Sequence, residues 1–276
     1  MNNQDFTANL TLGKSVKYTD QYDPSILDPI ERRKSRDFLN QQNNRLPFVG
    51  MDVWHVYEVS WINQNGLPQV CLARLIFDAS SQYLIESKSL KLYFNSLNNT
   101  VFESTEILTQ TLVKDLSKAS SSSVEVYLLP INNNYQFASF ESWLCLDNLE
   151  VQMQIPADIN TSYLSFESDK VSEKLYTNLF KSNCLVTNQP DWASVFIEYS
   201  GTKINHTQLL KYLVSYRNHS GFHEHCVERI YTDLINLASF EFLCVIAKYT
   251  RRGGIDITPY RSTSRVQPNF DRTPRQ

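Results

Sequence analysis

The sequence predicts an α+β protein that consists of two related units, and three observations support this prediction. First, aromatic and β-branched segments alternate with turns rich in Asn, Gly and Pro, a pattern typical of antiparallel strands. Second, each half of the chain contains a segment with the apolar spacing of an amphipathic helix. Third, strands, helices and strands follow one another in both halves, although few residues are identical between them. We therefore expect antiparallel sheets with helices packed on one face, in a tandem divided near residues 145–150.

In the first half, residues 1–45 are polar, and we expect an extended arm with one short helix. The segments VWHVYEVSWI (53–62) and QVCLARLIF (69–77) flank an Asn-Gly turn, which predicts a hairpin. The segment STEILTQTLVKDLSK (104–118) opens with a Ser or Thr cap, and its apolar spacing predicts a helix. Its expected buried stripe comprises Ile107, Leu108, Thr111, Leu112 and Leu116. A serine linker at 120–123 leads to the predicted strand VEVYLL.

In the second half, LEVQMQI (149–155) and the segment 183–199 are expected to be extended strands. Residues 205–238 have the apolar spacing of two consecutive helices. The segment EFLCVIAKYTRRGGIDITPYRS (241–262) predicts a hairpin that turns at its two adjacent glycines. Because antiparallel sheets expose edges that must be covered, we also expect the chain to form an oligomer.

The composition limits the classes of function. The formal net charge of −3 over 276 residues argues against a nucleic-acid-binding protein that acts through a broad basic surface. No segment resembles a signal peptide, and none approaches the roughly 20 apolar residues of a membrane span. The five cysteines are odd in number and widely spaced, which favours a reduced, cytoplasmic protein over a disulfide framework. With only seven glycines, neither the G-x-G-x-x-G nor the Walker A spacing occurs.

Cys184 and Asp191 are the first candidates for chemistry. They lie seven positions apart in NCLVTNQPDW, and a turn is predicted between them because Pro190 interrupts the strand. Such a bend can bring a thiol and a carboxyl group together as a nucleophile and a proton donor that share one proton. An aspartic acid that donates a proton at pH 7 needs a pKa about three units above its usual value, or about 4 kcal/mol. A buried thiol at an ordinary bend is the alternative interpretation.

His223 and Glu224 follow Gly221 at the predicted start of a helix. The helix dipole alone favours a glutamate in the first turn, but Glu224 could also accept hydrogen bonds from the ring N–H and amino groups of a guanine-like heterocycle. The sequence HEHC does not predict a metal site. His223, His225 and Cys226 cannot all converge from one helix, and no second pair of ligands has the spacing of a zinc site.

Two charged segments are candidates for binding an anion. ESKSLK (86–91) follows an apolar strand and is expected to be a charged surface loop; alternatively, its serine and lysine side chains bind a phosphate or a ribose. RRGG (251–254) is expected to be a turn; alternatively, Arg252 and Gly253 allow a guanidinium and the backbone to approach a phosphate closely.

Together these segments closely resemble the family of NADPH-dependent 7-cyano-7-deazaguanine reductases, the nitrile reductases of queuosine biosynthesis. The similarity runs from about residue 50 to 262, and the four motifs that carry it occur in order: ESKSLKLYFNS, NCLVTNQPDW, FHEHC and RRGGIDI. The resemblance implies the long form of the family, with tandem tunnelling-fold units in a homodimer. It implies an N-terminal arm (1–45), a first unit with the ESKSLK signature (46–148) and a second unit with the reactive cysteine and aspartate (149–276).

The resemblance also implies a role for each matching residue. Cys184 would form a covalent thioimide with the nitrile carbon, and Asp191 would protonate the nitrile nitrogen. The residues expected to bind the deazaguanine are Ile85, Glu86, Ser87, His223 and Glu224. The residues expected to bind NADPH are Ser87, Lys88, Arg252 and Gly253. The implied reaction uses two NADPH and no metal, and we assign no role to His225.

Two other functions remain open at this point. A zinc-dependent pterin or GTP cyclohydrolase could share the architecture, but it would need Cys and His ligands that the sequence does not assemble. A non-catalytic purine-binding protein or RNA-modification scaffold would leave Cys184 buried and unreactive. The resemblance favours a cytoplasmic reductase whose substrate is 7-cyano-7-deazaguanine, with neither a nucleic acid nor a membrane as a direct partner.

Overall fold

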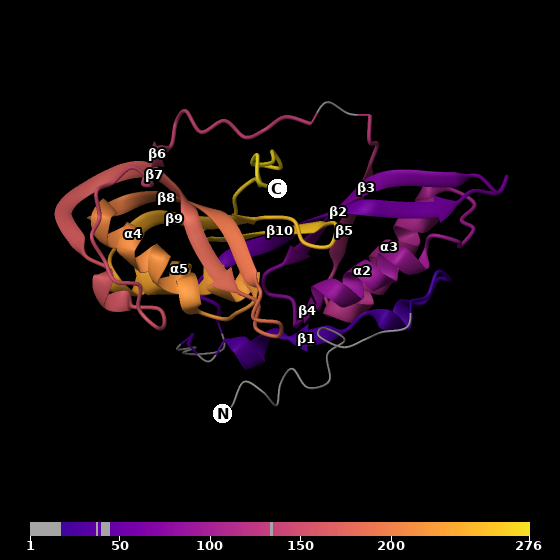
Figure 1. The fold of residues 1–276 in the computed structure, drawn as a ribbon, viewed down its shortest axis with the longest axis horizontal. Helices are drawn as coiled ribbons and strands as arrows, with labels where there is room; N and C mark the ends of the chain where they lie inside the picture. The colour runs from indigo at the N-terminus through magenta and orange to yellow at the C-terminus, as the bar shows by residue number, and fades with distance from the viewer. Residues whose placement is uncertain (1–17, 37, 40–44, 133–134) are drawn as a thin grey trace. The chain divides into compact units, whose positions relative to one another are not determined.

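The computed structural model describes residues 18–36, 38–39, 45–132 and 135–276 (Figure 1). The chain divides into two compact units, each assembled from three segments. Unit 1 comprises Met1–Ser35, Val53–Asn134 and Arg251–Asp256. Unit 2 comprises Arg36–Asp52, Tyr135–Thr250 and Ile257–Gln276. Among the described residues, no helix is both long enough and apolar enough to span a membrane.

The sheet of unit 1 contains β2 (Val49–Ile62), β3 (Pro68–Asp78) and β5 (Val124–Leu129), in the order β5-β3-β2. The Asn-Gly turn predicted between β2 and β3 is confirmed, and Gly66 adopts there the positive φ, 79°, that glycine tolerates best. β3 pairs antiparallel with β5. The side chains of β3 alternate between two environments, and those in the core are Cys71, Ala73, Leu75 and Phe77.

Two helices, α2 (Ser87–Ser96) and α3 (Thr105–Ser120), lie on one side of this sheet (Figure 1). The helix predicted at 104–118 is confirmed, and the Ser104 hydroxyl caps it by accepting a hydrogen bond from a backbone N–H of the first turn. The expected stripe is only partly buried: Ile107 is 40% exposed. The stripe residues that are fully buried are Leu108, Leu112 and Leu116.

The predicted N-terminal arm falls partly on residues 1–17, which lie outside the described residues. Its described part contains β1 (Pro29–Glu31) and two short 3-10 helices, Pro24–Ile26 and Arg32–Ser35. β1 pairs antiparallel with β4 (Tyr83–Ile85), immediately before α2. This small sheet holds the residues that lead into α2 against the N-terminal segment of unit 1.

The sheet of unit 2 has more strands than the sheet of unit 1 and is mostly antiparallel. Its strands, in the order in which they pair, are β10 (Ile255–Ser262), β9 (Phe240–Tyr249), β8 (Pro190–Ile204), β7 (Phe166–Asn183) and β6 (Leu144–Cys145), and the first residues of β10 belong to unit 1. β7 and β8 form a long hairpin, and β6 pairs with β7 in parallel. The antiparallel-rich sheets and the helices of both units confirm the predicted α+β class.

One expectation for the second half is wrong, and one strand was not predicted. Residues 149–155 do not form a strand, because none of them is buried and no strand pairs with them. Instead, β7 occupies Phe166–Asn183, a segment whose first half is so charged that it does not predict a strand. Ion pairs on the exposed face explain this composition, because Lys174 of β7 lies 3.1 Å from Glu198 of β8.

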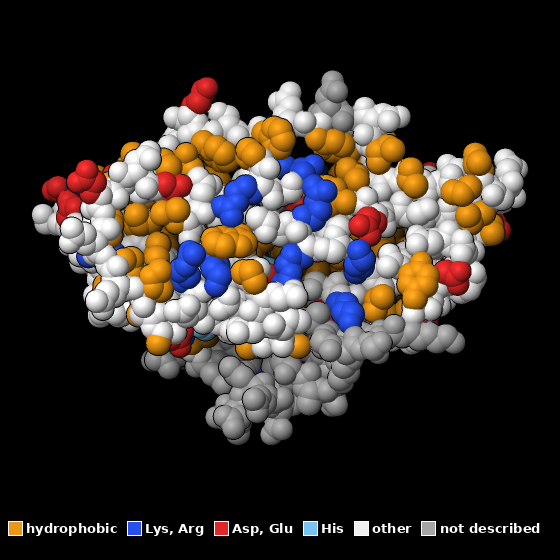
Figure 2. All heavy atoms as spheres, viewed as in Figure 1, with side chains coloured by type: hydrophobic (Ala, Val, Ile, Leu, Met, Phe, Trp, Pro, Cys, Tyr) orange, Lys and Arg blue, Asp and Glu red, His pale blue; other side chains and the backbone are white. Residues whose placement is uncertain are grey.

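The two helices predicted at 205–238 are confirmed as α4 (His206–Val214) and α5 (His223–Leu237). Both lie on one side of β7, β8 and β9 (Figure 1). α5 is the more deeply buried, and its core residues include Cys226, Val227, Ile230 and Leu234. Apolar side chains also remain exposed among charged ones on the face drawn in Figure 2.

Candidate active site

Cys184 lies in the turn that joins β7 to β8, at the end of the long hairpin of unit 2. Its backbone N–H donates to the carbonyl of Gln189 at 2.8 Å, and its carbonyl accepts from the N–H of Asn188 at 2.9 Å. Asn188 adopts a φ of 54°, a left-handed conformation that asparagine tolerates better than most residues. The predicted break before Pro190 is therefore confirmed. It holds the Cys184 side chain, 8% exposed, in a fixed tight turn.

Asp191 is the second residue of β8 and pairs with Ser182 of β7. Paired residues of antiparallel strands direct their side chains to the same face of a sheet. Cys184 follows Ser182 by two positions and begins the turn directly after β7 ends at Asn183. The Asp191 side chain is only 2% exposed. The hairpin thus brings the predicted nucleophile and the predicted acid to one end of the sheet.

The first turn of α5 reaches the same end of the hairpin. His223 opens the helix, and its Nε2 lies 3.6 Å from Oδ1 of Asp191. The His223 ring also packs edge to face on Tyr249 of β9, with 3.9 Å between the ring centroids. Glu224 follows in the same turn and is 2% exposed. His223 therefore connects the start of α5 to Asp191.

Three hydrogen bonds fasten the loop before α5 to the Cys184 turn. The N–H of Asn183 donates to the carbonyl of His219 at 2.8 Å, and the N–H of Gly221 donates to the carbonyl of Asn183 at 3.0 Å. The Ser220 hydroxyl donates to Oδ1 of Asn188 at 3.1 Å. Because these bonds tie both sides of the turn, its position relative to α5 is fixed within unit 2.

Cys226 is a second thiol in this part of unit 2, but it differs from Cys184. It is fully buried, and burial raises its pKa to about 12, an effect that the negative charges of Asp191 and Glu224 increase. Its thiol therefore stays protonated at neutral pH, and its side chain belongs to the buried face of α5. Within the described ranges, no group of three or more His, Cys, Asp and Glu side chains is arranged to hold a metal ion.

In unit 1, Glu86 is the N-cap of α2. Its carboxylate accepts hydrogen bonds from the backbone N–H groups of Lys88 at 2.7 Å and Ser89 at 2.8 Å. ESKSLK was expected to be a loop and is instead the start of a helix, so that expectation is wrong. Burial raises the pKa of Glu86, while the two backbone N–H groups and the Ser87 hydroxyl oppose the shift. Ile85, also buried, ends β4 directly before this cap.

The RRGG turn is confirmed between β9 and β10, where Arg252 and Ile255 exchange two backbone hydrogen bonds. Gly253 and Gly254 both have positive φ, at 57° and 78°. Nζ of Lys91, in α2, donates to the carbonyl of Gly253 at 2.8 Å. Lys91 stands one helical turn beyond Lys88. This contact therefore joins the two segments that were predicted to bind the cofactor.

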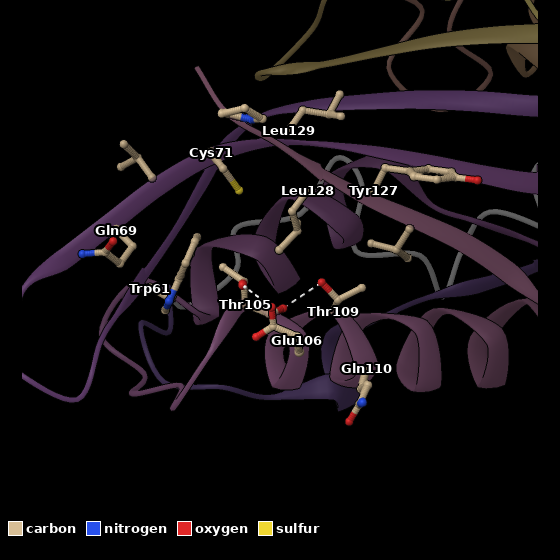
Figure 3. A pocket seen from close by; sticks show the side chains of 13 residues that line it. Trp61, Gln69, Cys71, Thr105, Glu106, Thr109, Gln110, Tyr127, Leu128 and Leu129 are labelled. Carbon is tan, nitrogen blue, oxygen red and sulfur yellow. Dashed lines mark hydrogen bonds between the residues drawn. The ribbon is translucent and has the colours of Figure 1, made fainter. Parts of the chain in front are cut away.

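A separate groove of about 700 Å³ lies between α3 and the strands β3 and β5 of unit 1 (Figure 3). Its walls are largely apolar, with Trp61 and Cys71 on the strands and Leu128 opposite α3, as Figure 3 shows. Polar side chains of α3, including Thr105 and Glu106, form its rim. No predicted site residue lines this groove, so it does not belong to the candidate active site.

The predicted site residues therefore fall into two groups, each described within its own unit. Those of unit 2 are Cys184, Asp191, His223 and Glu224. Those of unit 1 are Ile85, Glu86, Ser87, Lys88, Arg252 and Gly253. The sequence did not single out Tyr249, which contacts His223 and sits in an apolar strand without any signal. Lys91, which contacts Gly253, was covered only as one of the two lysines of ESKSLK.

Comparison with known proteins gives matches over most of the chain. Residues 18–128 match the family model described as the N-terminal part of nitrile reductase, 7-cyano-7-deazaguanine reductase, and residues 190–268 match one described as QueF-like protein. Curated relatives from Legionella pneumophila strains Lens and Corby are 48% and 47% identical over 263 residues. Each alignment covers 94% of this chain and 92% of the relative, and both relatives are called NADPH-dependent 7-cyano-7-deazaguanine reductase.

Proposed function

The chain belongs to the family of NADPH-dependent 7-cyano-7-deazaguanine reductases, and from this premise we propose that it reduces a nitrile through a covalent thioimide on Cys184. The substrate is 7-cyano-7-deazaguanine, and the product is 7-aminomethyl-7-deazaguanine. The reduction takes four electrons, which NADPH, when bound, supplies as two hydrides used in turn. The observation that carries this proposal is the end of the β7–β8 hairpin, where Asp191 lies 3.6 Å from His223 in the first turn of α5 and Cys184 begins the adjoining turn.

Cys184 acts as the nucleophile. Its sulfur forms a bond to the nitrile carbon while the nitrogen takes up a proton, so that S–H adds across the triple bond and gives a thioimide. This capture divides a difficult reduction into easier steps. After the first reduction the C–S bond breaks, Cys184 leaves as a thiolate, and an imine remains. The low exposure of Cys184 itself keeps water away from that imine until the second reduction.

Asp191 supplies the proton to the nitrile nitrogen. A buried carboxyl group at the same end of the hairpin as the thiol is suited to act as the general acid in this step. His223 supports this role because its Nε2 lies 3.6 Å from the Asp191 carboxylate and limits the orientations that the carboxylate can take. Tyr249 in turn fixes the His223 ring by edge-to-face packing.

Glu224 and Glu86 are the proposed acceptors for the N–H groups of the deazaguanine. Each carboxylate offers two oxygens in one plane, which matches the adjacent ring N–H and amino donors of a guanine-like edge. The hydrogen bonds that Glu86 accepts from two backbone N–H groups fix the orientation of its carboxylate. Ile85 and Ser87 flank Glu86 in the chain and are proposed to line the substrate with it, as is His223 beside Glu224.

The residues of unit 1 fit an anionic dinucleotide. Lys88 in the first turn of α2 and Arg252 in the β9–β10 turn supply positive charge, and Ser87 adds a hydroxyl. At Gly253 a Cβ atom would lie 3.2 Å from Cδ of Lys91, so a larger residue would crowd the turn that faces α2. We propose that Lys88 and Arg252 bind phosphate oxygens, and that the Ser87 hydroxyl and the Gly253 backbone make further contacts.

The proposal extends to the whole protein. We propose that the two units are tandem tunnelling-fold units, that the chain forms a homodimer, and that it acts in the cytoplasm in the queuosine biosynthesis of tRNA. The family membership supports all three statements. The antiparallel-rich sheet of each unit, with its helices on one side, further supports the first.

Intact-protein mass spectrometry tests the proposal. Incubation with 7-cyano-7-deazaguanine in the absence of NADPH should increase the mass of the protein by the mass of one ligand. Cys184→Ala should abolish the increase. Cys145→Ala is the matched control, because Cys145 is the least buried of the five free cysteines, and it should leave the adduct unchanged. An unmodified wild-type protein, or an adduct that persists in Cys184→Ala, contradicts the proposed nucleophile.

A further inference from the structure

A chain of polar side chains in unit 1 has no part in the chemistry proposed above. Asp256 is buried at the start of β10, and one of its carboxylate oxygens accepts a hydrogen bond from the Tyr57 hydroxyl. Its other oxygen lies 3.0 Å from Nδ1 of His55, and Nε2 of the same ring accepts a hydrogen bond from Nε of Arg74 at 3.2 Å. Because Nε2 is an acceptor, the ring proton sits on Nδ1 and points toward Asp256. This chain fixes the hydroxyl end of Tyr57.

The ring of Tyr57 carries Arg251 on its face. The guanidinium carbon of Arg251 lies 3.7 Å from the ring centroid, and the residue is exposed. A guanidinium on an aromatic ring is attracted to the negative face of the ring, and the contact uses the flat face of the cation. Its N–H donors lie in the guanidinium plane, in a rigid fork. Through Tyr57, this part-buried chain therefore fixes the ring on which the Arg251 guanidinium packs.

Arg251 also stands directly before the turn that is proposed to bind the cofactor. Arg252 and Gly253 follow it, and the Gly253 carbonyl is held by Lys91. The Lys91 ammonium lies 2.9 Å from a carboxylate oxygen of Glu58, so its charge is balanced within the chain. The guanidinium on Tyr57 is thus a second cation beside Arg252, at a position fixed by packing.

NADPH differs from NADH by one phosphomonoester on the 2′-oxygen of the adenosine ribose. Such a group carries close to two negative charges at neutral pH and three acceptor oxygens, and a guanidinium can bind it through two parallel hydrogen bonds. We propose that Arg251, oriented by Tyr57, recognises the 2′-phosphate of NADPH and sets the preference for NADPH over NADH. This inference rests on the proposed function, because it takes the β9–β10 turn as part of the cofactor site.

The test compares Arg251→Ala with two other variants. Arg251→Lys keeps the charge but loses the planar fork, and Arg265→Ala removes an equal charge from an exposed position in unit 2. Calorimetric titration with adenosine 2′,5′-bisphosphate and adenosine 5′-monophosphate measures recognition of the 2′-phosphate without turnover. We expect wild type and Arg265→Ala each to bind the bisphosphate about 10- to 100-fold more tightly than the monophosphate. Arg251→Ala should bind the two ligands about equally, and Arg251→Lys should lie between.

Steady-state kinetics give a second readout. Arg251→Ala should raise the KM for NADPH by about 10- to 100-fold and leave the KM for NADH and the kcat unchanged. If Arg251→Ala keeps the wild-type preference for the bisphosphate, or if the KM rises equally for both cofactors, the inference is wrong. Wild-type turnover of 7-cyano-7-deazaguanine with NADPH is measured first. If the wild type shows no turnover, the proposed function is contradicted. The role of Arg251 is then still tested by the binding of the two adenosine ligands.

Discussion

At the scale of single residues, the Asp191 carboxyl group is surrounded by groups whose protonation depends on its charge. Burial is the largest cause of the raised pKa values of Cys226 and Tyr249, and the negative charge of Asp191 adds to both shifts. Burial lowers the pKa of Lys181, and Asp191 opposes that shift. The thiol of Cys226 and the phenol of Tyr249 thus remain protonated at neutral pH. The proposed role of Asp191 as the proton donor therefore concerns a carboxyl group buried among these side chains.

Asp191→Asn tests this role, because the amide has the same shape but cannot donate the proton. We expect kcat and the rate of adduct formation to fall by about 10²- to 10⁴-fold, the usual range for the loss of a general acid. Non-covalent binding of 7-cyano-7-deazaguanine, measured by calorimetry in a Cys184→Ala background, should change far less. Equal losses in turnover, adduct formation and binding would show that the substitution distorts the site, and would contradict a specific role in proton transfer.

The residue scale also shows where sequence reasoning reaches its limit. The turn beside Cys184 could be predicted because Pro190 cannot continue the hydrogen-bonding pattern of a strand. The cap formed by Glu86 could not, because Ser, Thr, Asp and Asn are the usual N-caps and a glutamate gives no signal there. Tyr249 was missed for a different reason. It is one of many aromatic residues in apolar strands, and only the fold places it against His223.

At the scale of elements, the β9–β10 turn depends on two glycines for different reasons. Gly254 has a φ of 78°, and a Cβ atom there would lie 2.7 Å from Cδ of Glu58. Glu58 is the carboxylate that pairs with Lys91, and Lys91 holds the carbonyl of Gly253. The turn, β2 and α2 are therefore linked by a few contacts that a single methyl group can disturb.

Gly254→Ala and Gly66→Ala form a matched pair that isolates this effect. Both glycines have a φ near 80°, but a Cβ atom at Gly66 would meet nothing within 4 Å. Each substitution should lower the free energy of unfolding by about 1 kcal/mol through the left-handed backbone alone. Gly254→Ala should in addition displace Glu58 from Lys91 and raise the KM for NADPH several-fold. Urea unfolding and steady-state kinetics measure the two effects, and an equal KM in both variants would contradict the link.

The elements differ in how well the sequence predicts them. The 104–118 helix and both helices of 205–238 have a clear apolar period, and the structure confirms them. The segment 149–155 has the alternation of a strand but finds no partner, whereas β7 lacks the pattern and forms because β8 pairs with it along its length. Pairing between strands is a tertiary interaction that overrides local propensity, so a single sequence cannot show it.

At the scale of the whole molecule, residues far apart in the sequence meet in the interior of unit 2. Glu228 of α5 accepts hydrogen bonds from Arg36 at 2.7 Å and from Arg261 at 2.8 Å, and Arg261 also donates to Asp52 at 2.8 Å. All four side chains are buried. No local pattern predicts such a cluster, because each member is an ordinary charged residue in its own segment. The cluster joins α5 to β10, to the start of β2 and to Arg36, which precedes β2. Its member in α5, Glu228, lies four positions after Glu224.

Breaking this cluster should affect the stability of the protein and its dependence on pH. Burial alone would raise the pKa of Glu228, but Arg261 and Arg36 lower it far below its usual value. A group whose pKa is lowered by folding stabilises the protein above the pKa of the unfolded state, about 4.3 for glutamate, and loses this contribution as the pH falls below that value. Glu228→Gln should therefore lower the free energy of unfolding by about 3 kcal/mol at pH 7, because it leaves buried guanidinium groups without their carboxylate.

Urea unfolding of wild type and Glu228→Gln at several pH values between 7 and 3 measures the prediction. The difference between the two proteins should be constant down to about pH 5 and should shrink as the pH is lowered further, because protons then compete with Arg36 and Arg261 for Glu228. Glu241→Gln is the matched control, since Glu241 pairs with Lys170 at 3.5 Å on the surface, where a pair contributes about 0–1 kcal/mol. Two outcomes would mean that the buried cluster does not stabilise the fold through charge. In the first, Glu228→Gln lowers the free energy of unfolding no more than Glu241→Gln does. In the second, the loss of unfolding free energy caused by Glu228→Gln grows toward low pH.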